Sequence, residues 1–198
     1  MGTAPMDKSR GFTLIEVLIS MLIMAIGLLG LAGMQAVAQR AEVESYQRAQ
    51  ALVLVQDMVD RVNANRKVAG CYAFTPTAGS LYAGTGATAP TCAGAFGTAQ
   101  QRAQADADML AWHNLLTGAA EALGANQVGA MVGARGCVIL DTTVAPNVYR
   151  VQVAWQGMTP TVNPTSIDAK LTCATGQYGT DLQRRVISQS FPMACLNC

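Results

Sequence analysis

Residues 8–38 read KSRGFTLIEVLISMLIMAIGLLGLAGMQAVA, and this stretch decides what kind of protein the chain is. From residue 17 to residue 38 it contains no charged side chain. An α-helix rises about 1.5 Å per residue, so this run is roughly 33 Å long and matches a bilayer hydrocarbon core of about 30 Å. The sequence therefore predicts one transmembrane helix.

The composition of the whole chain excludes several classes of protein. Its 198 residues are 51% hydrophobic and 13% charged, with a formal net charge of +1. Disordered chains combine low hydrophobicity with high net charge, and nucleic-acid binders carry a basic surplus, so we expect neither class. A polytopic membrane protein needs several long apolar runs, whereas this chain has one.

Basic residues precede the apolar run and cysteines follow it. Lys8 and Arg10 favour a cytoplasmic N-terminus by the positive-inside rule, which places the rest of the chain outside. An even number of cysteines in an exported domain predicts disulfide bonds. The six candidate disulfide cysteines, whose pairing stays open, are Cys71, Cys92, Cys137, Cys173, Cys195 and Cys198.

A cleaved secretory signal peptide is the alternative interpretation of the apolar run. Ala36, Val37 and Ala38 form the small-residue pattern of a signal peptidase site. The run is, however, longer than the usual apolar region of about 7 to 15 residues, and Glu16 places an acid at its head. We therefore expect the helix to be retained.

The string KSRGFTLIE at residues 8–16 resembles the processing motif of type IV prepilins. The resemblance implies that a membrane prepilin peptidase cuts between Gly11 and Phe12 and that Phe12 becomes the N-methylated first residue. It also implies that Glu16 acts in subunit assembly, by pairing with the Phe12 amine of a neighbouring subunit.

Elementary chemistry fits these roles. Gly11 has no β-carbon to obstruct a protease, and residues 12 and 16 share a face if both are helical. In lipid, an ammonium paired with a carboxylate relieves two unpaired groups together. The alternative is that Glu16 merely sits at the interface, where the positive end of the helix favours an acid.

The helical pattern continues beyond the membrane run. Leu52, Val55, Val59 and Val62 follow three- and four-residue spacing, and no Pro or Gly occurs between Gly33 and Gly70. We expect one helix of about 55 residues. The predicted organisation is a leader at 1–11, a transmembrane half-helix at 12–38, an amphipathic half-helix at 39–69 and a disulfide-containing head at 70–198.

The first part of the head combines an irregular segment with a helix. Residues 70–98 are rich in Gly, Ala, Thr and Pro, and a bridge from Cys71 to Cys92 would restrain them, although six cysteines allow fifteen pairings. A second helix is predicted over residues 100–123, with Met109, Trp112, Leu116 and Leu123 on its buried face.

In the last third of the chain, apolar residues recur at every second position. Strands are predicted over Cys137–Leu140, over Tyr149–Trp155 as a half-buried alternation, over Ile167–Leu171 and over Arg184–Phe191. A long helix followed by antiparallel strands gives an α+β class. This order resembles the type IV pilin fold, a long N-terminal helix packed on a C-terminal antiparallel β-sheet head.

Cys195 and Cys198 form a C-x-x-C at the end of the chain. A redox role would require a helix start that lowers a thiol pKa, and a zinc site would require a second ligand pair. Neither is visible, so we expect structural disulfides, either between these two cysteines or separately with Cys173 and Cys137.

The remaining candidate ligands carry no recognisable site. His113 lacks a second metal ligand and is expected to be packed or exposed. Asp106 and Asp108 lack the loop pattern and glycine of a calcium site. We expect no enzymatic activity, no cofactor and no metal.

Residues 17–35, together with the strand ending in Trp155 and Gly157, resemble minor pilins of the PilV type. The resemblance implies a structural and assembly component of the type IV pilus. Its partners would be the prepilin peptidase, other pilins and minor pilins, the inner-membrane assembly machinery and membrane lipid. It would sit in the inner membrane with a periplasmic head and then in the pilus.

Two other functions stay open. The chain could be a minor pseudopilin of a type II secretion system, or an unrelated secreted, disulfide-rich binding protein. A mature N-terminus at Phe12 distinguishes both assembly roles from the last, for which a start at Gln39 is expected.

Overall fold

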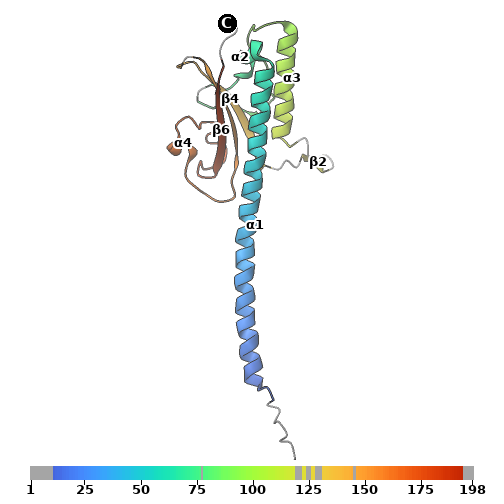
Figure 1. The fold of residues 1–198 in the computed structure, drawn as a ribbon, viewed down its shortest axis with the longest axis vertical. Helices are drawn as coiled ribbons and strands as arrows, with labels where there is room; N and C mark the ends of the chain where they lie inside the picture. The colour runs from blue at the N-terminus through green and yellow to red at the C-terminus, as the bar shows by residue number, and fades with distance from the viewer. Residues whose placement is uncertain are drawn as a thin grey trace, which may run out of the picture. The chain divides into compact units, whose positions relative to one another are not determined.

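A computed structural model describes residues 11–76, 78–118, 131–144 and 146–193, and the backbone of residues 122–123 and 126–127. The chain divides into two compact units, residues 1–42 and 43–198. Helix α1, Leu14–Ala64, runs through both (Figure 1). The predicted long N-terminal helix is thus confirmed, with 51 residues.

The first unit consists, in its described part, of the beginning of α1. Thr13 starts the helix, since its carbonyl accepts the N–H groups of Glu16 and Val17. All side chains from residue 11 to residue 42 are exposed. The apolar part of α1 reaches a mean hydropathy of 2.5 over 18 residues, so by length and composition it can cross a membrane.

In the second unit α1 ends earlier than predicted. Asn65 has a non-helical φ of −115°, and its side-chain amide donates to the Gln101 carbonyl and to the Tyr72 hydroxyl. A 3-10 turn, η1 (Arg66–Val68), and the short helix α2 (Ala69–Tyr72) follow. The expected helix to residue 69 is therefore wrong at its end, because tertiary hydrogen bonds hold Asn65 outside the helix.

The predicted second helix also differs at its end. Helix α3, Ala99–Leu116, begins with a capping box in which Thr98 and Gln101 bond reciprocally. It stops before Gly118, whose φ of +83° is left-handed and ends the helix. Strand β2 (Ala122–Leu123) occupies the last two residues of the predicted helix and pairs with β3 (Asn126–Gln127).

The head sheet is antiparallel with the order β1-β4-β5-β6. Its strands are Ala83–Gly84, Arg135–Asp141, Val148–Gln156 and Arg184–Pro192. Three strand predictions are confirmed. The strand predicted over Ile167–Leu171 is wrong, because Ile167 ends a short helix, α4 (Pro164–Ile167), and the Leu171 N–H then closes a turn on the Asp168 carbonyl at 2.9 Å.

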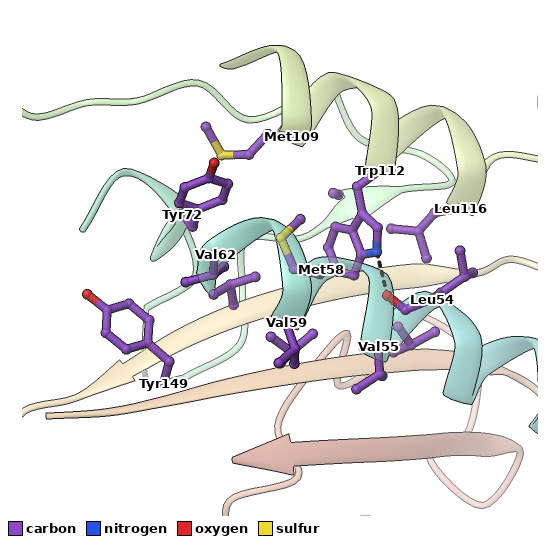
Figure 2. Close-up of a cluster of buried hydrophobic side chains, with 14 of the residues drawn as sticks. Leu54, Val55, Met58, Val59, Val62, Tyr72, Met109, Trp112, Leu116 and Tyr149 are labelled. Carbon is purple, nitrogen blue, oxygen red and sulfur yellow. Dashed lines mark hydrogen bonds between the residues drawn. The ribbon is translucent and has the colours of Figure 1, made fainter. Parts of the chain in front are cut away.

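The head part of α1 packs between α3 and the sheet. Figure 2 shows Val55 and Val59 of α1 turned toward the strands, whereas Trp112 and Leu116 reach α1 from α3. Leu52 is 53% exposed, so its place on the predicted buried stripe is wrong. Leu54 is buried instead, since the side of α1 that meets two surfaces runs through residues 51, 54, 55, 58, 59 and 62.

Candidate functional site: the N-terminal motif and the head that follows it

The predicted cleavage site lies outside regular structure. Gly11 and Phe12 precede the first helical residue, Leu14. The Phe12 side chain is 82% exposed, and no atom of the described residues would lie within 4 Å of a β-carbon added at Gly11. A peptidase can therefore reach the bond between them without unwinding a helix.

Glu16 occupies the first turn of α1, where the unsatisfied N–H groups of a helix favour an acid. Its backbone carbonyl accepts the Ser20 hydroxyl at 2.7 Å. Its carboxylate forms no ion pair with the described residues. Phe12 lies before the helix, so the expected shared face with Glu16 is absent from the uncleaved chain.

Two disulfides tie the irregular segments of the head to its regular elements. Cys71 of α2 pairs with Cys92, and Cys137 of β4 pairs with Cys173. The first closes the segment between α2 and α3, and the second anchors the segment before β6 to the sheet. The predicted candidates Cys195 and Cys198 lie outside the described residues.

A buried polar cluster holds the segment around Cys173 against the sheet. Gln152 of β5 accepts the Cys173 N–H at 3.0 Å and donates to the Lys170 carbonyl at 2.7 Å. Arg184 donates to the Leu171 and Cys173 carbonyls at 2.8 and 3.1 Å. Gln152 and Arg184 are both 0% exposed. Strand alternation had placed Gln152 on a polar face, and no local signal shows that another segment covers that face.

A second polar cluster joins α1, α2 and α3. The Tyr72 hydroxyl donates to Asp108 Oδ2 at 2.5 Å, and Arg61 donates to Asp108 Oδ1 at 3.2 Å. Burial, and then the hydrogen bond to Asp108, raise the pKa of Tyr72 well above its usual value. Tyr72 therefore stays a protonated donor. Asp106 is engaged separately, as acceptor of the Cys92 N–H at 2.6 Å.

His113 lies at the edge of the core, where its Nδ1 accepts the Gly84 N–H at 3.1 Å. Burial lowers its pKa, which favours the neutral ring that this hydrogen bond requires. The ring thus supports the turn after β1. Within the described part of the chain, no group of three acidic, histidine or cysteine residues is arranged to hold a metal ion.

Comparisons with known families agree with the motif and with the fold. Residues 6–32 match the prokaryotic N-terminal methylation motif, and residues 33–108 match the family described as Type IV pilin Tt1218. Searches of curated proteins and of solved structures give no match. The chain therefore carries the methylation motif followed by a type IV pilin family segment, and its long helix on an antiparallel sheet is consistent with the type IV pilin fold.

Proposed function

We propose that this chain is a minor pilin of the PilV type, a structural and assembly component of a type IV pilus. One observation carries the proposal: the methylation motif leads directly into a membrane-length helix that continues into a disulfide-bonded head. The matched family is structural, which favours an assembly role over an enzymatic one. The resemblance of residues 17–35 supports the PilV assignment.

The proposed function implies a topology. Lys8 and Arg10 keep the leader, residues 1–11, in the cytoplasm, and the segment from residue 12 to residue 38 spans the inner membrane. The amphipathic half, 39–69, leads to the head, 70–198, in the periplasm, where disulfides persist. The partners are the prepilin peptidase, other pilin subunits, the inner-membrane assembly machinery and lipid.

The processing step is tested by the mass of the mature N-terminus. In cells with the prepilin peptidase we expect the chain to begin at N-methylated Phe12, and in cells without it we expect residues 1–11 to be retained. Gly11→Val adds a branched side chain before the scissile bond and should block cleavage. A mature start at Gln39 would show ordinary signal-peptide cleavage and refute the pilin assignment.

The assembly role of Glu16 is tested separately. In lipid, the new Phe12 amine and a Glu16 carboxylate from another subunit neutralise each other. Glu16→Val should be cleaved normally and yet enter filaments at less than a tenth of the wild-type level. Glu42→Ala, which removes an exposed acid from the same helix, is the matched control and should assemble normally. Normal incorporation of Glu16→Val would disprove the pairing.

A deletion separates the pilus from the secretion system. We expect loss of the gene to abolish piliation and twitching while exoprotein secretion continues. The opposite phenotype would assign the chain as a type II secretion pseudopilin.

A further inference from the structure

The connection from β5 to β6, residues 157–183, leaves the sheet beside the beginning of the head part of α1. Near the end of β5 the paired residue of β6 is Arg185, and its Nη2 donates to the Glu44 carboxylate of α1 at 2.8 Å. Figure 2 shows Tyr149, at the start of β5, on the side of the core where Val62 lies. Strand β5 therefore runs back along α1, and the connection follows it at the Glu44 end.

The first turn of this connection has a fixed place beside α1. The Thr161 N–H donates to the Leu182 carbonyl at 2.7 Å, which ties the two ends of the connection together. Arg185 Nη2 donates to the Thr159 carbonyl at 2.8 Å as well as to Glu44, so the turn and the helix meet at one nitrogen atom. The turn is thus held at the level of residue 44 of α1.

Three apolar side chains of this turn and its partner segment are exposed. Met158 is 51% exposed, Val162 is 61% exposed and Leu182 is 46% exposed, and we call these three residues the apolar tip. Residues 156–167 contain no charged side chain. The two charges beside the turn, Glu44 and Arg185, neutralise each other. The tip therefore presents an apolar, uncharged surface.

Helix geometry gives the distance of this tip from the apolar run. Glu44 follows residue 38, the end of the charge-free run, by six residues on the same continuous helix, which corresponds to about 9 Å. The headgroup layer of a bilayer is roughly 5–8 Å thick on each side of the hydrocarbon core. The turn beside Glu44 therefore lies at the outer surface of that layer when residues 12–38 span the membrane.

We propose that the apolar tip docks onto the periplasmic surface of the membrane that α1 spans. The proposal rests on the proposed function, which places residues 12–38 in the inner membrane. Exposed apolar side chains gain free energy when they enter the boundary between headgroups and acyl chains, and an uncharged turn has no ion to desolvate there. The helix already holds the tip at this boundary, so docking requires no separate binding event.

Geometry favours lipid over the other occupants of this position. The Met193 N–H bonds to the Asn147 carbonyl at the far end of β6, eight residue steps or about 26 Å from Arg184. The five residues that follow Met193 can extend at most about 18 Å, so they cannot cover the tip. Lipid, in contrast, surrounds the apolar run of α1 before any other subunit arrives.

The test uses the full chain, reconstituted in vesicles of phosphatidylcholine and phosphatidylglycerol whose acyl chains carry bromine near the headgroup. Val162→Trp places a fluorophore in the tip. The matched control is Val144→Trp, an exposed valine (46%) in the turn at the opposite end of β5. After subtraction of the parent signal, we expect bromine to quench position 162 at least about threefold more than position 144. Equal quenching at the two positions would overturn the proposal.

A charge in the tip tests the apolar contact itself. In the Val162→Trp chain, Met158→Asp should lower the quenching to the level of position 144, because a carboxylate resists entry into the membrane, whereas Met158→Leu should preserve it. Unchanged quenching with Met158→Asp would overturn the proposal. If this variant lowers the urea midpoint of the head, Leu182→Asp replaces it and must reduce the quenching to the same extent.

Two measurements separate lipid from protein and this inference from the proposed function. Quenching at position 162 should persist when the vesicles hold fewer than about one chain each, and quenching that needs a higher density would mean that a second copy covers the tip, which overturns the proposal. Release of the parent chain by alkaline carbonate would mean that α1 does not span the membrane and that the proposed function fails. A chain that resists carbonate but shows equal quenching at 162 and 144 would mean that the docking inference alone fails.

Discussion

Trp112 of α3 contacts both α1 and strand β4 of the head sheet. It is 0% exposed, and its indole N–H donates to the Leu54 carbonyl of α1 at 2.9 Å. Its ring covers Gly136 of β4 so closely that an added β-carbon would lie 2.5 Å from Cζ3, nearer still to Cη2, and 2.7 Å from Leu116 Cδ1. Gly136→Ala therefore forces the ring, and with it α3, away from the sheet.

The expected free energies follow from this geometry. Overpacking a core typically costs 1–3 kcal/mol, so Gly136→Ala should lower the free energy of unfolding by about 2 kcal/mol. Trp112→Phe removes a hydrogen bond worth about 1 kcal/mol and leaves space at the end of the ring, for a total of about 2 kcal/mol. In the double variant, the methyl group added at residue 136 occupies that space. The double variant should therefore lose about 1–2 kcal/mol less unfolding free energy than the two single variants lose together.

The assay is urea unfolding of the full chain in detergent. Trp155, buried in the same core and present in all four proteins, reports head unfolding by fluorescence. Additive effects of Gly136→Ala and Trp112→Phe, or a neutral Gly136→Ala, would refute the close packing of this ring on β4.

Three further outcomes are expected from the head. Tyr72→Phe should lower the free energy of unfolding by about 1.5–3 kcal/mol, because the Tyr72 hydroxyl donates to the Asp108 carboxylate. The control Tyr82→Phe should change it little, because the Tyr82 hydroxyl bonds to an exposed glutamine. Equal effects of the two variants in urea unfolding would contradict this prediction. Burial lowers the pKa of His113, so the unfolded chain takes up the proton at a higher pH than the folded chain does, and stability should fall as the pH drops below about 6.5. In thermal melts between pH 8 and pH 5, the melting temperature of His113→Gln should lose this pH dependence. Replacing Cys137 and Cys173 by alanine removes a disulfide that closes a loop of sequence separation 36, and the chain-entropy relation predicts a loss of about 4 kcal/mol of unfolding free energy. An unchanged urea midpoint would show that the buried polar cluster of Gln152 and Arg184 is enough to hold the segment around Cys173 against the sheet.

Most helices and strands could be predicted because their signals are local. An uninterrupted apolar run, a three- and four-residue spacing and a two-residue alternation each depend only on neighbouring residues, and they located α1, α3, β4, β5 and β6. The N-terminal motif belongs to the same class, since the chemistry of its cleavage site lies within a few consecutive residues.

Two of the errors, at Asn65 and at Leu52, occurred where distant contacts decide the conformation. Asn65 leaves the helix because its amide bonds across to α3, and Leu52 is exposed because α1 meets α3 and the sheet on adjacent sides. The strand predicted over Ile167–Leu171 failed for a local reason, since Asn163 and Pro164 begin a helical turn that includes Ile167, and a further turn follows it. Periodicity carries no information about which surface arrives from elsewhere in the chain.

By itself the sequence determined that this chain has one membrane-length helix, preceded by a methylation motif. It also determined that an α+β head follows, with cysteines that form disulfides in an exported protein. Only the tertiary structure decided that Cys71 pairs with Cys92 and Cys137 with Cys173, and that Gln152 is buried beneath a covering segment. The physical reason is that pairing and burial depend on which surfaces meet, whereas helix formation and membrane insertion depend on the chain's own neighbouring residues.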